Sequence, residues 1–134
     1  DAWRLDGVLT YVRGERDDVE DDLYRITPAT LRVSATYEQA SWSASLETLM
    51  VAEQDKVSVE NSEAETPGHV LVNAYGRWEV NERVSLSAGI ENLLDQPYRD
   101  HLGGYNRNAG LGVPVGERVP GAGAGVWMRL NTRF

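Results

Sequence analysis

The chain has 134 residues, 41% of them hydrophobic and 8% aromatic, which is enough for one ordinary folded domain and unlike a disordered chain. A formal net charge of −8 without clustered Lys and Arg excludes nucleic acid as a partner, because such binding needs basic side chains that neutralise phosphates. The absence of cysteine excludes a disulfide scaffold and a cysteine-based zinc site. No apolar run is long enough for a transmembrane helix.

Six segments of the chain alternate strictly between apolar and polar residues, which is the period of a β-strand. In chain order they cover residues 2–13, 29–38, 41–54, 69–80, 83–93 and 125–134. None of them has a competing helical period, so we predict an all-β, antiparallel chain. The strands of a transmembrane barrel are only half apolar, so the lack of long apolar runs does not exclude a barrel.

The predicted connections are alternately short and long. Gln39-Ala40 and Asn81-Glu82 leave room only for tight hairpins, whereas residues 14–28, 56–68 and 95–124 are long and rich in Asp, Glu, Gly and Pro. We therefore expect both short turns at the end of the sheet opposite residues 95–124. Short turns at one end and long loops at the other are typical of outer-membrane barrels.

Five aromatic residues fall near the predicted turn end and on the apolar face of their strands. This placement predicts a girdle facing the membrane interface, because amphipathic rings prefer that environment. The alternative is that they pack the core of a soluble sandwich. The residues are Trp3, Tyr37, Trp42, Trp78 and Phe134.

The opposite face of the predicted strands is polar. In a large barrel it would line a hydrated lumen or touch a plug, and in a soluble sandwich it would face the solvent. Six strands cannot close a barrel with a polar interior, so we expect a segment of a larger barrel. The chain starts at Asp1 with neither Met nor a signal peptide, as a processed product or an excised fragment would. The polar residues are Arg32, Glu38, Glu47, Asn73, Arg77, Glu79, Glu91, Arg129 and Arg133.

The chain lacks catalytic signatures. It has no nucleophile-elbow, zinc-protease or phosphate-loop motif, so we predict that it is not an enzyme and needs no cofactor. Residues 15–22 read ERDDVEDD and lack the spacing of a calcium-binding loop. We interpret this segment as a solvated charge run.

The most specific pattern is Asn92-Leu93-x-Asp95-x-x-Tyr98, which follows a predicted strand. Asn92 and Asp95 can bond nearby backbone amides, and Pro97 stops the strand ladder, so we expect a strand-to-loop junction. The last predicted strand stops on the aromatic Phe134. Together these features resemble the C-terminal end of TonB-dependent outer-membrane receptors.

The resemblance implies that residues 1–134 are the final strands of a 22-stranded barrel in the outer membrane of a Gram-negative bacterium, with the plug domain and earlier strands absent from the chain. It implies active import of a scarce metal ion or a metal chelate such as a siderophore. The partners would be the lipid bilayer, the plug and TonB, which contacts a TonB box elsewhere in the receptor. The alternative function is a soluble β-rich binding module.

Two further expectations follow from this resemblance. The strand that ends on Phe134 would be recognised by the outer-membrane assembly machinery through strand addition. The last long loop is similar to that of the copper- and zinc-associated branch of these receptors, which makes His101 a candidate metal ligand. The alternative for His101 is an ordinary surface histidine in a mobile loop.

Overall fold

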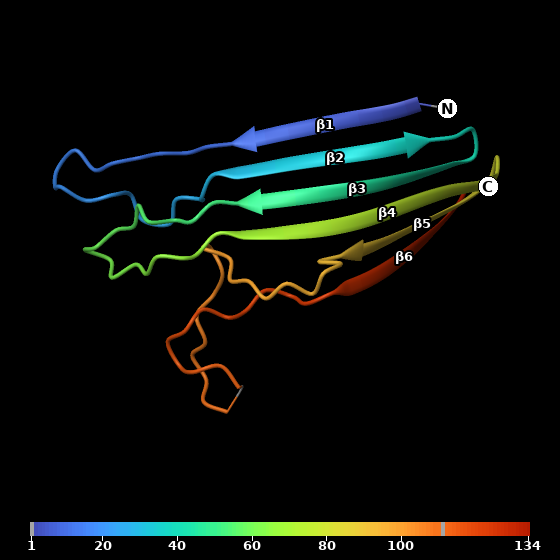
Figure 1. Ribbon diagram of the computed structural model, residues 1–134. Helices are drawn as coiled ribbons and strands as arrows, with labels where there is room; N and C mark the ends of the chain where they lie inside the picture. The colour runs from blue at the N-terminus through green and yellow to red at the C-terminus, as the bar shows by residue number, and fades with distance from the viewer. Residues whose placement is uncertain (1, 111) are drawn as a thin grey trace.

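The computed structural model describes residues 2–110 and 112–134. Its core element is one sheet of six antiparallel strands whose spatial order follows the sequence (Figure 1). The described residues include no helix that is long and apolar enough to cross a membrane. The strands are β1 (Ala2–Thr10), β2 (Thr30–Glu38), β3 (Trp42–Val51), β4 (His69–Asn81), β5 (Val84–Glu91) and β6 (Gly125–Thr132).

Four strands end earlier than the alternating pattern predicted: β5 and β6 by two residues each, and β1 and β3 by three residues each, where β2 begins. Thr30 begins β2 and lies opposite Thr10 on one side and Val51 on the other. β2 therefore has no residues with which residues 11–13 and 52–54 could pair. Alternation alone cannot show this limit, because it depends on where the partner strand starts.

The two short turns lie at the same end of the sheet, as predicted (Figure 1). We call this end the turn end. The Gln39 amide donates to Trp42 O at 2.8 Å, so the first turn includes Ser41. Asn81 belongs to β4, and its Oδ1 accepts from the Arg83 amide at 2.9 Å after a bulge between Glu79 and Asn81. The second turn is therefore one residue later than predicted.

Three long loops occupy the opposite end, which we call the loop end (Figure 1). They are the β1–β2 loop (residues 11–29), the β3–β4 loop (residues 52–68) and the β5–β6 loop (residues 92–124).

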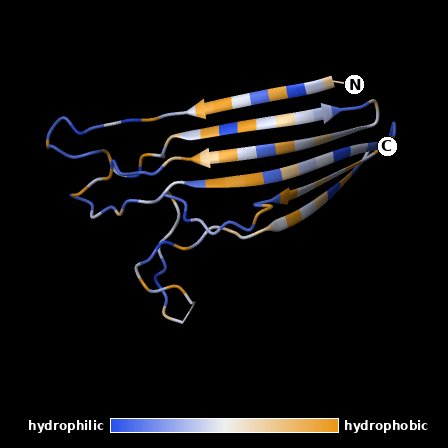
Figure 2. Cartoon of the chain, viewed as in Figure 1, coloured by the Kyte–Doolittle hydropathy of each residue, from blue (hydrophilic) through white to orange (hydrophobic). Residues whose placement is uncertain are grey.

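Hydrophobic and hydrophilic residues alternate along the strands (Figure 2). The strand register keeps this alternation in phase across the whole sheet, so one face is apolar and the other polar. Leu71 is the one large apolar side chain that is buried among the described residues, whereas Trp3 is 71% exposed. A soluble sandwich would cover its apolar face with a second layer. One apolar row across the sheet is Leu5, Ala35, Leu46, Ala74, Ile90 and Val126.

Candidate functional site

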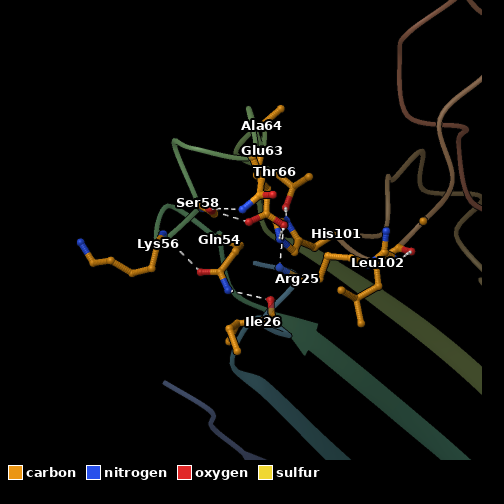
Figure 3. Close-up of polar contacts among 12 residues, drawn as sticks. Arg25, Ile26, Gln54, Lys56, Ser58, Glu63, Ala64, Thr66, His101 and Leu102 are labelled. Atoms are coloured by element: carbon orange, nitrogen blue, oxygen red, sulfur yellow. Dashed lines mark hydrogen bonds and ion pairs between the residues drawn. The ribbon is translucent and has the colours of Figure 1, made fainter. Parts of the chain in front are cut away.

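The three long loops meet at the carboxylate of Glu63, in the β3–β4 loop (Figure 3). Its Oε1 accepts from the Arg25 amide of the β1–β2 loop at 3.0 Å and lies 3.2 Å from Nε2 of His101 in the β5–β6 loop. Its Oε2 accepts from the Ser58 amide at 3.0 Å. We call these four residues the loop hub. One side chain thereby links all three loops.

His101 is buried, which corrects the interpretation of an ordinary surface histidine. Its Nδ1 lies 2.8 Å from the Thr66 hydroxyl. A carboxylate only accepts, so Nε2 carries the proton that is shared with Glu63, and Nδ1 of the neutral ring accepts from Thr66. Burial lowers the pKa of His101, and the nearby Arg118 cation lowers it further against the opposing effect of Glu63. The ring is therefore neutral at pH 7.

A metal would have to compete for ring nitrogens that are already engaged. Across residues 2–110 and 112–134, no group of three or more His, Asp or Glu side chains is placed to hold a metal ion. The contacts of His101 instead describe a residue that packs one loop against another.

Arg118 is a second buried group that joins the loops. Its guanidinium donates to the carbonyl of Ala64 in the β3–β4 loop at 3.2 Å and to that of His101 in its own loop. It also lies over the Tyr105 ring, 4.7 Å from the centroid. A planar guanidinium suits this combination of several acceptors and a ring face.

Asp21 attaches the acidic segment of residues 15–22 to the β3–β4 loop. Its carboxylate accepts from the fully buried Ser58 hydroxyl at 2.6 Å and from the Val59 amide at 2.8 Å. The Ser58 contact contributes most to holding the pKa of Asp21 below its usual range. Asp21 of the charge run is thus half-buried and hydrogen-bonded to another loop.

The junction motif is built around Asn92, which is only 3% exposed and has a left-handed backbone with φ of 49°. Its Oδ1 accepts from the Gln96 amide at 2.9 Å, and its Nδ2 donates to the carbonyls of Gln96 at 3.0 Å and Ala122 at 3.2 Å. Its own amide donates to Asn73 Oδ1 at 2.9 Å. Asn92 thus joins β4, the start of the β5–β6 loop and the segment that enters β6.

The other motif residues complete this junction. The Asp95 carboxylate accepts from the Ala124 amide at 2.8 Å, and the Leu93 amide donates to the Val72 carbonyl at 2.7 Å. The structure thus places the junction where the sequence pattern does.

Tyr98 shows that the β5–β6 loop folds over the polar face. Its ring stacks on His69, with centroids 4.7 Å apart, and the register places His69 on the same face as Leu71 and Asn73. A side chain at Gly121 would overlap the Tyr98 ring, so glycine is required at that position. The loop therefore covers part of the polar face at the loop end.

Four of the five predicted girdle aromatics group together on the apolar face near the turn end. Trp3 lies opposite Tyr37, with ring centroids 5.0 Å apart, and Trp42 lies opposite Trp78. The Tyr37 and Trp42 centroids are 5.7 Å apart. Phe134 lies two residues past the end of β6, so the register does not place it beside the other four.

Several predicted polar-face residues form hydrogen bonds or ion pairs on that face, some across strands and one, Arg77 with Glu79, within β4. Asn73 Nδ2 donates to Glu47 Oε1 at 2.9 Å, and Arg32 lies 3.8 Å from the same carboxylate. Nearer the turn end, Arg77 binds Glu79, and Arg4 approaches Glu38 to 2.8 Å. These contacts form a polar lining that is hydrogen-bonded within the sheet.

Trp127 is an aromatic of the polar face that sequence reasoning missed. It lies directly opposite Gly89, and a Cβ at Gly89 would come within 2.5 Å of the indole. Tyr75 is its aromatic neighbour, 6.2 Å away between centroids. The sequence alone does not show that Trp127 and Gly89 are neighbours, so this pairing could be recognised only once the register was known.

Comparison with known proteins identifies the class of this sheet. Residues 1–93 match the family described as TonB dependent receptor-like, beta-barrel. Among solved structures, the chain is similar to "Copper transporter OprC", with 29% sequence identity and a TM-score of 0.91. The similarity covers 98% of this chain and 21% of that protein. No curated protein gave a match.

The chain therefore belongs to the TonB-dependent receptors, as a segment of their antiparallel β-barrel in the outer membrane of Gram-negative bacteria. This membership confirms the predicted family, fold class and location. It also replaces the alternative of a soluble β-rich module.

Proposed function

We propose that this chain is part of the barrel wall of a TonB-coupled importer that carries a metal ion or metal chelate. The observation that carries the proposal is the likeness to a copper transporter over 98% of the chain at a TM-score of 0.91. The family membership supports coupling to TonB and a plug that fills the lumen. Copper, alone or chelated, is the first candidate substrate.

In this proposal residues 1–134 are the final strands of a 22-stranded barrel, and its other parts supply the plug and the TonB box. The apolar face contacts lipid, with Trp3, Tyr37, Trp42 and Trp78 at the membrane interface. The loop end faces the cell exterior and the polar face lines the lumen. The strand that ends on Phe134 is recognised by the assembly machinery, and the chain performs no catalysis.

Metal content of cells tests the proposed import. The gene would be deleted in its own bacterium, and copper, zinc and iron would be measured by mass spectrometry after growth with each metal limiting. We expect one metal, first of all copper, to fall in the deletion strain and equally in a strain without TonB. The full-length receptor should restore the metal only when TonB is present. Unchanged contents of all three metals would overturn the proposal.

A further inference from the structure

We propose that the three long loops form one lid, which the loop hub holds closed and which opens as a single unit. The starting observation is that Glu63 takes a donor from each loop: the Arg25 amide, the Ser58 amide and His101 Nε2. The side chains of Glu63 and His101 are 2% and 1% exposed, so water does not replace these contacts while the loops are packed.

Pairwise contacts that do not involve Glu63 connect the same loops again. The β1–β2 and β3–β4 loops share the contact of Asp21 with Ser58 and the bond from Gln54 Nε2 to the Ile26 carbonyl, at 2.9 Å. The β3–β4 and β5–β6 loops share Arg118. The β1–β2 and β5–β6 loops share the bond from the Arg25 guanidinium to the Leu102 carbonyl, also at 2.9 Å (Figure 3). Every pair of loops is therefore joined directly.

The burial of the hub explains why the loops should open together. If the β1–β2 loop or the β5–β6 loop moved away alone, the Glu63 carboxylate would lose a donor while the remaining loops still covered it. A buried charge that lacks a partner is strongly unfavourable, so a partly opened arrangement is less stable than either end state. Segments with this property open as one cooperative unit.

Opening of the lid would also change the polar face of the sheet. The β5–β6 loop that carries His101 also places Tyr98 on His69 of the polar face. Release of the hub would free the loop that covers this part of the polar face. The lid would therefore control access from the loop end to the polar face.

Hydrogen exchange of the full-length receptor in detergent, followed by mass spectrometry, tests the single lid. The variant Glu63→Ala removes the hub, and Glu60→Ala is the matched control. Glu60 lies in the same loop, but its carboxylate is 54% exposed and pairs with the half-buried Arg16 of the β1–β2 loop instead of joining the loop hub. We expect Glu63→Ala to raise exchange at least tenfold in peptides from all three loops, with the strands unchanged. Glu60→Ala should change exchange less than threefold.

An increase confined to the β3–β4 loop, or an equal effect of Glu60→Ala, would overturn the proposal. The unmodified receptor supplies a second test that does not depend on folding of a variant. At alkaline pH, where exchange is limited by opening, peptides from the three loops should share one opening rate. Three different rates would also overturn the proposal. The readout is exchange alone, so the result is independent of what the receptor imports.

Discussion

Replacement of Asn92 by Ala should loosen the entry to both the β5–β6 loop and β6. The Asn92 side chain makes three hydrogen bonds, one from the Gln96 amide and one each to the Gln96 and Ala122 carbonyls. Alanine can make none of them. It also tolerates the left-handed backbone at φ 49° less well than asparagine, whose short polar side chain favours that conformation.

The size of the effect follows from these losses. Each hydrogen bond contributes about 1 kcal/mol net, and the left-handed conformation adds about 1 kcal/mol for alanine. Two of the three bonds join Asn92 to the same residue, Gln96, so their contributions are not fully additive, and we expect a total of about 3 kcal/mol. At about 1.4 kcal/mol per tenfold change, this corresponds to roughly a hundredfold shift in the local opening equilibrium.

Hydrogen exchange at single amides measures this shift in the full-length receptor. The Gln96 amide, which donates to Asn92, should lose about a hundredfold in protection. Asn92→Gly keeps the backbone conformation accessible and should lose less, because it forfeits only the side-chain contacts. Asn131→Ala, at an exposed position of β6, is the control and should leave Gln96 unchanged. Protection of Gln96 within threefold of the parent in Asn92→Ala would refute the role of Asn92.

Three more predictions concern other parts of the chain. Gly89→Ala should displace the Trp127 indole and cost about 1–3 kcal/mol in urea unfolding of the receptor. Gly7→Ala, whose Cβ would meet no atom within 4 Å, should cost clearly less, and equal costs would contradict the packing argument. His101 has a lowered pKa when folded, so its contribution to loop stability should be complete above about pH 6.5 and decline as pH falls through the folded pKa. Exchange protection of the β5–β6 loop should follow this profile in the parent and lose it in His101→Gln; a pH-independent parent would contradict it. Deletion of Phe134 should reduce the outer-membrane level of the receptor several-fold at unchanged transcript, because burial of one Phe, at about 1.5–3 kcal/mol, is too small to unfold a large barrel. Equal levels on immunoblots of outer-membrane fractions would leave no assembly role for Phe134.

The strands could be predicted because each has one apolar and one polar face. Apolar and polar residues therefore alternate along the sequence of each strand. Their ends could not, since β1 and β3 stop where Thr30 begins their common partner. The junction at Asn92 was also predictable, because its contacts to Gln96 lie within four residues. Local chemistry of this kind is visible in a short stretch of sequence.

The loop hub was outside the reach of sequence reasoning. Glu63 and His101 are 38 residues apart. Two of the three donors to Glu63 are backbone amides, which almost any residue type could supply, so the sequence does not reveal them. Nothing local distinguishes Glu63 from the neighbouring acidic residues Glu60 and Glu65. Only the packing of the loops decides which of these carboxylates is buried.

The orientation of the two faces is the central claim, and spin labels on single cysteines test it most directly. The chain has no cysteine, so each introduced one is a unique probe within it. In the full-length receptor in lipid vesicles, with cysteines elsewhere replaced, a label at Leu46 of the apolar face should collide with dissolved oxygen far more than with a water-soluble nickel chelate. Labels at its neighbours Ser45 and Glu47, on the polar face, should show much lower oxygen accessibility. Equal accessibilities at the three positions, or a reversed pattern, would contradict the account.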